Sequence, residues 1–184
     1  MKPTEELKKE HEAIKLMLSV LDKVSGKLES RKEVSPEHLE KIIEFIKVFA
    51  DKCHHGKEED LLFVAMEEAG VPREGGPIGV MLMEHDAGRG YVRGMSDAVS
   101  RYKSGDGNAA SEIAENARHY INLLTQHIEK EDTILYPFAD IQLSEEKQKE
   151  LMEGFEKIEL ERVGPGKHEE FHQLLKQLKE IYLG

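Results

Sequence analysis

The stretch 54-HHGKEEDLLF-63 occurs a second time, in related form, as 127-HIEKEDTILY-136. Aligned without a gap, the two copies share a His, a Lys, a Glu, an acidic residue, a pair of aliphatic residues and an aromatic ring. The His and the Glu are four residues apart, and on a helix this spacing places both side chains on one face, one turn apart. An imidazole and a carboxylate in this arrangement can hold one metal ion between them. Two copies therefore predict a site for two metal ions.

The sequence around the two copies has the hydrophobic spacing of amphipathic helices, with apolar residues three or four positions apart. Breaks rich in Gly, Pro and Ser separate the predicted helices, which cover residues 4–28, 36–69, 78–102, 113–138, 145–160 and 167–183. Pro137 predicts a kink or a stop near the end of the fourth helix. We therefore predict an all-α protein, with an up-down-up-down four-helix bundle over residues 1–140. The two additional helices form a C-terminal extension, residues 141–184, that packs on the bundle.

Composition narrows the classes of partner. The 184 residues carry a net charge of −11 with a pI near 5.3, which argues against binding to nucleic acid or to anionic membrane surfaces. No apolar run is long enough to span a bilayer, and residues 1–12 are charged rather than apolar, unlike a signal peptide. The single cysteine, Cys53, cannot form an internal disulfide. These features predict a soluble protein of the cytoplasm.

Six polar residues fall on the apolar faces of the four predicted bundle helices. In an up-down bundle these side chains lie in the same half of the molecule at similar depth, because adjacent helices run in opposite directions. No Lys or Arg occupies the same positions, and buried carboxylates and imidazoles are costly unless a positive charge neutralises them. A pair of divalent metal ions satisfies this requirement, and nitrogen and oxygen ligands without thiolate favour iron or manganese over a structural zinc site. The six residues are His11, His54, Glu58, His85, His127 and Glu131.

The doublet His54-His55 leaves two possible registers for the first copy. A pair made of His55 and Glu59 would bring Lys52 to the same inward face, so we assign His54 and Glu58 as the inward pair. His55 and Glu59 are then expected to support the ligands from outside.

Other motifs allow further interpretations. The run 168-HEEFH-172 matches the H-E-x-x-H pattern of zinc metallohydrolases, although no later His is present to complete such a site. Cys53 is interpreted as a small buried residue rather than a redox sensor. His119, Tyr91 and Tyr120 either support the site or belong to ordinary helix packing, and His38 is expected at the surface.

Taken together, the metal-binding motifs resemble the hemerythrin-like (HHE cation-binding) family. The resemblance rests on His11, on His54 with Glu58, on 84-EHDAGR-89, and on His127 with Glu131 followed by 135-LYP-137. It implies a non-heme di-iron centre in a four-helix bundle, with both glutamates and an oxo or hydroxo group bridging the two irons. The implied ligands are His11, His54, Glu58, His85, His127 and Glu131.

One position departs from the oxygen-carrying members of that family. These use a pair of third-helix histidines four residues apart, whereas here Arg89 follows His85 at that spacing. The remaining four histidines and two glutamates are similar to the set in iron–sulfur cluster repair proteins. The resemblance thus implies a protein that binds or senses O2 or NO, or that handles oxidants and iron. The alternative is a di-iron enzyme that reduces peroxide or NO, and after it a zinc metallohydrolase that uses His168 and His172.

Overall fold

The computed structural model describes residues 1–184, and every regular element in it is a helix, so the all-α prediction is confirmed. Labels with η mark π-helical stretches, in which backbone hydrogen bonds span five residues rather than four. The elements are α1 (Pro3–Glu29), α2 (Pro36–Phe45), η1 (Ile46–His55), η2 (Glu58–Leu62), α3 (Phe63–Glu68), α4 (Pro77–Lys103), α5 (Ala109–Lys130), η3 (Glu131–Leu135), α6 (Tyr136–Gln142), α7 (Glu145–Ile158), η4 (Glu159–Val163) and α8 (Lys167–Tyr182). None of them combines the length and the apolar character that a membrane crossing requires.

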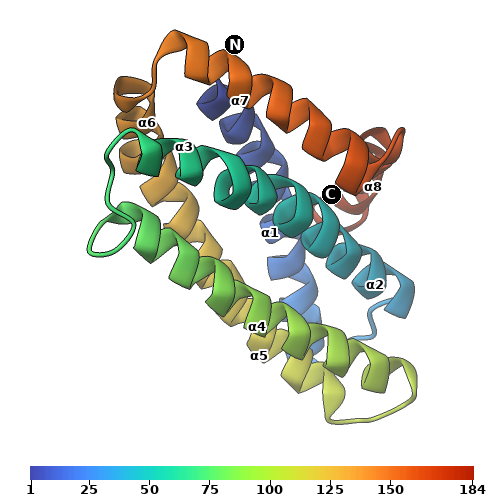
Figure 1. Cartoon of the computed structure of the whole chain (residues 1–184). Helices are drawn as coiled ribbons and strands as arrows, with labels where there is room; N and C mark the ends of the chain where they lie inside the picture. The colour runs from blue at the N-terminus through green and yellow to red at the C-terminus, as the bar shows by residue number, and fades with distance from the viewer.

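Four long helical rods make up the body of the molecule. The segments α2, η1, η2 and α3 follow one another as one rod, and α5, η3 and α6 form another, while α1 and α4 are each a single helix. Helix α5 packs against both α1 and α4, and α2 packs against α4. Figure 1 shows α7 running alongside the α2–α3 rod and over the start of α1, and α8 packs against α1 and α2.

The ends of the rods follow local chemistry. Gly70 has a φ of +98°, and the N–H of Val71 donates to the carbonyl of Met66 over 3.0 Å, which ends α3 as predicted. Pro137 behaves differently from the prediction of a kink or stop. It lies in the first turn of α6, directly after the π-helical stretch η3, and the rod continues to Gln142. At the start of a new α-helical turn the missing N–H of proline costs little.

A polar layer separates two apolar clusters along the rods. The larger cluster contains 28 buried residues, mainly from the second half of α1, from α2 and η1, and from facing parts of α4, α5 and α8. The smaller contains 14, mainly from α3, from the start of α4, and from α6 and α7, with Leu7 of α1. His11 lies on α1 between Leu7 of the smaller cluster and Ile14 of the larger one. The candidate site therefore sits inside the protein, with dry packing on both sides.

The internal repeat is reproduced in backbone geometry. The π-helical stretches η2 and η3 begin at Glu58 and Glu131, which are matching positions of the two copies. In each stretch the aromatic residue that follows donates its N–H to the glutamate five residues earlier, Phe63 to Glu58 and Tyr136 to Glu131. Such π-helical turns occur frequently at functional sites. Both inward glutamates are thus presented by the same local structure.

We predict that Gly79→Ala destabilises the protein. A Cβ at residue 79, in the first turn of α4, would lie 2.6 Å from the carbonyl oxygen of Arg73, and this oxygen can move only with its backbone. The expected loss in the free energy of unfolding is about 1–3 kcal/mol, as for other overpacked positions. The control is Gly26→Ala in α1, where the nearest atom is 3.9 Å away and alanine should add up to about 1 kcal/mol. Urea unfolding of both variants measures the difference, and equal midpoints would contradict the prediction.

Candidate metal centre

Seven buried side chains converge in the polar layer as two groups of potential metal ligands. The first group is His55, Glu58, His85 and His127, and the second is His11, His54 and Glu131. Within each group the potential ligand atoms lie within 4.8 Å of one another. All six residues predicted from the sequence are included, and the seventh is His55.

The two glutamates lie between the groups. One oxygen of Glu58 is 3.5 Å from Nε2 of His54 in the second group and 3.5 Å from Nε2 of His85 in the first. In the same way, Oε1 of Glu131 is 2.8 Å from Nε2 of His127 and 3.4 Å from Nε2 of His11. Each carboxylate therefore faces imidazoles of both groups.

Each of the five imidazoles is oriented by a carboxylate behind it. The Nδ1 atoms lie 2.6–3.1 Å from carboxylate oxygens, so that every Nε2 is directed into the site. The pairs are His11 with Asp132, His54 with Glu10, His55 with Asp51, His85 with Glu59 and His127 with Glu84. A carboxylate on the far nitrogen fixes the tautomer of a metal-binding histidine and makes it a stronger ligand.

Cations in turn contact these outer carboxylates. Lys57 donates to Glu10 over 2.6 Å, and Lys130 donates to Glu84 over 2.5 Å. These two lysines occupy the same position of the internal repeat, so each supports the histidine three residues before it. Arg89 donates to Asp51 over 2.9 Å and to Glu59 over 2.6 Å, and thereby connects the supports of His55 and His85. From the centre outward, each of these contacts therefore runs from an imidazole to a carboxylate and from the carboxylate to a cation.

The donor atoms at the centre fit a metal pair. Nε2 of His85 and Nε2 of His127 are 3.1 Å apart, and when both rings are neutral and donate through Nδ1 to carboxylates, two lone pairs face each other. Four further atoms are buried without a hydrogen-bond partner, namely Nε2 of His54, Oε1 of Glu58 and both carboxylate oxygens of Glu131. Buried acceptors of this kind are costly without a donor or a cation. A positive ion at each group removes the cost.

The electrostatics of the protein without metal support the same conclusion. Burial opposes protonation of His11, but its hydrogen bond with Asp132 and the nearby carboxylate of Glu131 raise its pKa to about 9. Burial likewise opposes protonation of His85, but the nearby carboxylate of Glu58 and the hydrogen bond with Glu59 raise its pKa to about 9. Protons on these two rings thus place one positive charge in each group. Burial, followed by the charge of Glu58, raises the pKa of Glu131 well above its usual value, as expected for two carboxylates that share one small space.

Aromatic rings close the site at the last position of each repeat. The ring of Tyr136 stacks on His11 at a centroid distance of 5.4 Å, and Phe63 stacks on His85 at 6.1 Å. The Tyr136 hydroxyl donates to Oε2 of Glu58 over 3.0 Å and lies 3.3 Å from Nε2 of His11. It is a proton donor inside the centre that the corresponding phenylalanine does not provide.

The structure gives His55 a different place from the one inferred from the sequence. Sequence analysis assigned it to an outer, supporting role, but its ring is buried, stacked on His85 at 3.8 Å, and its Nε2 belongs to the first group. The reason is local: in η1 the N–H of Gly56 bonds to Asp51 five residues earlier, and the wider π turn lets consecutive side chains face inward. Glu59 does have the supporting position expected of it.

The burial of Lys57 was also not predicted from the sequence, because only the six candidate ligand positions were considered for buried Lys or Arg. Its side chain is 0% exposed and lies among Glu10, Glu159 and the ring of Phe155. The lysine that both copies of the repeat share, Lys57 and Lys130, could have indicated a role for this position near the site. Glu10, Cys53 and Glu159 form a third cluster of potential ligands, but its cation is the Lys57 ammonium group.

The remaining sequence motifs lie elsewhere. His168 and His172 have rings 4.6 Å apart on α8, and Nδ1 of His168 is 3.7 Å from Glu159, outside the central groups. Cys53 is a buried free cysteine, and burial raises the pKa of its thiol to about 12.

His119 stacks on Tyr91 away from the site. The partly exposed His38 bonds to the hydroxyl of Tyr182 over 2.6 Å and joins α2 to α8. Tyr120 lies in the wall of a cavity that reaches the site.

Comparison with known proteins agrees with this geometry. The chain is 24% identical over 160 residues to the uncharacterized protein Mb2018 of Mycobacterium bovis and to the uncharacterized protein MT2051 of Mycobacterium tuberculosis. The matched region is 87% of this chain but 62% of each relative, so the chain spans less than two thirds of their length. No solved structure matches the chain. The profile of the hemerythrin HHE cation binding domain matches residues 2–139, which contain all seven central side chains, and the chain therefore belongs to this family.

Proposed function

We propose that the protein binds two non-heme iron ions, one at each of the two groups, with Glu58 and Glu131 as bridging ligands. His55, His85 and His127 would complete the first position, and His11 and His54 the second. The observation that carries the proposal is the set of five imidazoles whose Nδ1 atoms all contact carboxylates and whose Nε2 atoms all face inward. This arrangement belongs to metal-binding histidines. Iron is preferred because the ligands are nitrogen and oxygen without thiolate.

We further propose that the loaded centre binds O2, NO or peroxide, as a sensor or in the handling of oxidants. The second position has one histidine fewer than the first, which leaves room for an additional ligand there. An iron pair supplies binding positions and electrons for such small molecules. The protein supplies the Tyr136 hydroxyl, which donates to Oε2 of Glu58 and lies 3.3 Å from Nε2 of His11, and a dry surrounding that excludes bulk water.

In this proposal the four rods act as an up-down-up-down bundle, and residues 141–184 act as a C-terminal cover. The contact that supports a cover is Glu159 of η4, which reaches the buried Lys57 behind His54. A reducing cytoplasm is the proposed location, because the buried Cys53 has no disulfide partner.

Metal analysis tests the proposal. Protein loaded anaerobically with Fe(II) and freed of excess metal is expected to contain two irons per chain, measured by elemental analysis. Mixing this form with O2, NO or peroxide should change its absorption spectrum, and the chelated protein should show no change. A content of one zinc per chain after growth or loading with mixed metals, or identical spectra with and without iron, would contradict the proposal.

We predict that His55→Ala reduces metal binding as strongly as loss of a direct ligand. The affinity for the first ion is expected to fall by more than the 10–100-fold that is typical for removal of an outer supporting group. The comparison is Glu59→Gln, which changes only the support of His85 and should stay within that range. His119→Ala, far from the site, controls for the loss of an imidazole. Competition with a chromophoric chelator measures all three, and equal effects of His55→Ala and His119→Ala would remove His55 from the ligand set.

A further inference from the structure

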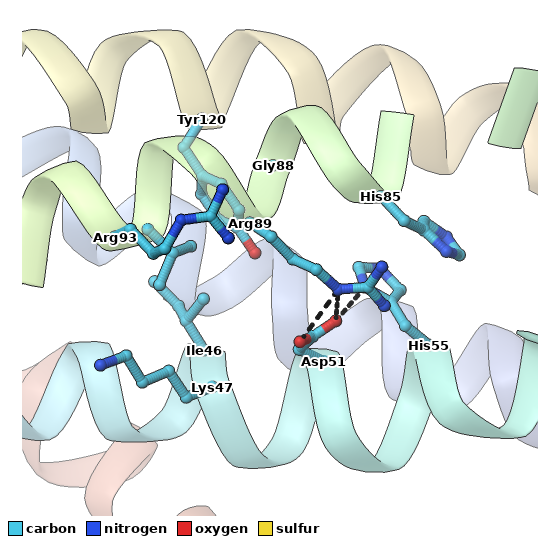
Figure 2. Close-up of a pocket in the computed structure, with 10 residues that line it drawn as sticks. Ile46, Lys47, Asp51, His55, His85, Gly88, Arg89, Arg93 and Tyr120 are labelled. Atoms are coloured by element: carbon cyan, nitrogen blue, oxygen red, sulfur yellow. Dashed lines mark hydrogen bonds and ion pairs between the residues drawn. The ribbon is translucent and has the colours of Figure 1, made fainter. Parts of the chain in front are cut away.

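A cavity of about 170 Å³ lies between η1 and α4 and reaches the first group of ligands. Figure 2 shows its inner end at the rings of His55 and His85, and its outer end at Lys47 and Arg93. The volume exceeds what a diatomic molecule needs, since a protein cavity of roughly 150 Å³ holds benzene. The cavity is therefore large enough for a small organic molecule beside the centre.

Two cations at the outer end have no carboxylate within ion-pair distance. The ammonium group of Lys47 donates only to the hydroxyl of Ser96, over 3.0 Å, and Arg93 forms no hydrogen bond or ion pair within the protein. Arg89, in the middle of the cavity wall, differs because Asp51, Glu59 and Asp86 already neutralise it. On a protein with a net charge of −11, two unpaired cations beside one cavity mark a local site for an anion.

The wall between the two ends combines apolar surface with one free donor. Ile46 and Val92 line the cavity, and the ring of Tyr120 adds to them. Tyr120 is 2% exposed, its hydroxyl bonds to no group of the protein, and in Figure 2 it points toward the cavity. The hydroxyl oxygen is not among the fully buried atoms that lack a partner, so it is accessible from the cavity and can donate to a bound molecule there. Burial raises the pKa of Tyr120, so the hydroxyl remains a donor at all ordinary pH values.

We propose that this cavity binds a small organic carboxylate with an apolar body of about the size of benzoate. The carboxylate pairs with Lys47 and Arg93 at the outer end, and one of its oxygens accepts a hydrogen bond from the Tyr120 hydroxyl. The apolar body lies against Ile46 and Val92 and extends toward His55 and His85. An inorganic anion such as phosphate would leave the apolar wall uncovered, and a neutral molecule would leave the two cations unpaired. Any effect of this ligand on a metal pair depends on the proposed function, whereas the binding of the carboxylate to the cavity does not depend on it.

Calorimetric titration of the full chain with benzoate tests the proposal. Benzoate is expected to bind both the iron-loaded and the chelated protein, with benzyl alcohol and phosphate at least about tenfold weaker, the effect of one hydrogen bond to a charged group. Equal binding of all three compounds would overturn the assignment of ligand class.

Variants locate the site. K47A/R93A should weaken benzoate binding about tenfold or more, and Tyr120→Phe should weaken it by a smaller factor. The matched control is K23A/K27A, which removes the same charge from exposed positions of α1 and should have no effect. Val92→Phe should fill the cavity and abolish binding while K47A/R93A retains the wild-type iron content. Benzoate binding that K47A/R93A and Val92→Phe leave unchanged would overturn the proposal.

The two proposals fail separately. If the protein binds no iron but benzoate binding still depends on Lys47 and Arg93, the cavity assignment stands and the di-iron function falls. If two irons bind and benzoate does not, the cavity assignment falls alone.

Discussion

Removal of the metal by chelation is expected to lower the midpoint of thermal unfolding by roughly 10 °C. A ligand present at 1,000 times its dissociation constant stabilises the folded state by about 4 kcal/mol, and for a chain of this size each kcal/mol shifts the midpoint by about 2–4 °C. The physical source is the polar layer, where Glu58 and Glu131 are fully buried and lack hydrogen-bond partners at three of their four oxygens. Differential scanning calorimetry of the iron-loaded and chelated forms measures the shift.

A variant separates metal binding from general stability. Glu58→Gln keeps the shape of the side chain and removes a buried carboxylate. The chelated variant loses the contact of Glu58 with protonated His85 and should unfold at a lower temperature than the chelated wild type, and added iron should raise its midpoint by fewer degrees. If chelation leaves the wild-type midpoint unchanged, the polar layer is stable without cations and the charge argument fails.

Replacement of Lys57 by Met is expected to cost about 3–5 kcal/mol in the free energy of unfolding, the usual result of removing one partner of a buried ion pair. Lys57 is fully buried, and Glu10 is 5% exposed, so no water can replace the ammonium group. Burial opposes the charge on Lys57, but the charge of Glu10 raises its pKa, so the lysine is protonated throughout the ordinary pH range. The loss is measured by urea unfolding of the metal-free protein.

The internal repeat supplies the matched control. Lys130 contacts Glu84 as Lys57 contacts Glu10, and each carboxylate supports a histidine of the centre. The side chain of Lys130 is 38% exposed, however, so Lys130→Met should cost less than about 1 kcal/mol. Equal losses in the free energy of unfolding for the two variants would show that burial does not determine how much Lys57 contributes to stability.

Much of the architecture could be predicted from the sequence because it depends on local rules. Hydrophobic spacing identified the helices, and Gly70 ended α3 through its positive φ as expected. The two His-Glu pairs were visible because helical periodicity brings residues four apart onto one face. The prediction that the six candidate residues are metal ligands remains a prediction, although the structure brings all of them together.

What could not be predicted depends on departures from α-helical periodicity and on contacts between distant segments. His55 turns inward because η1 is π-helical, and a search with α-helical spacing places it outside. His54 is supported by Glu10 of α1, and Glu10 is in turn paired with Lys57. Lys57 is buried partly because Glu159 of η4 contacts it, and no sequence pattern near residue 57 indicates this distant contact. Likewise, Arg89 stands where oxygen carriers have a histidine, but its contacts with Asp51 and Glu59 appear only once η1, η2 and α4 are assembled.

Because η4 and α7 cover the first repeat, the two proposed metal positions differ in how easily reagents from solution reach them. Behind His54 the protein is closed by Glu10, Lys57, Glu159 and Phe155, whereas beside His55 and His85 a cavity opens. A chelator or a reductant then has a short route to one ion and a long route to its neighbour. For the proposed iron pair we expect biphasic kinetics of metal removal, in which one iron is withdrawn quickly and the other leaves only as fast as the C-terminal helices detach.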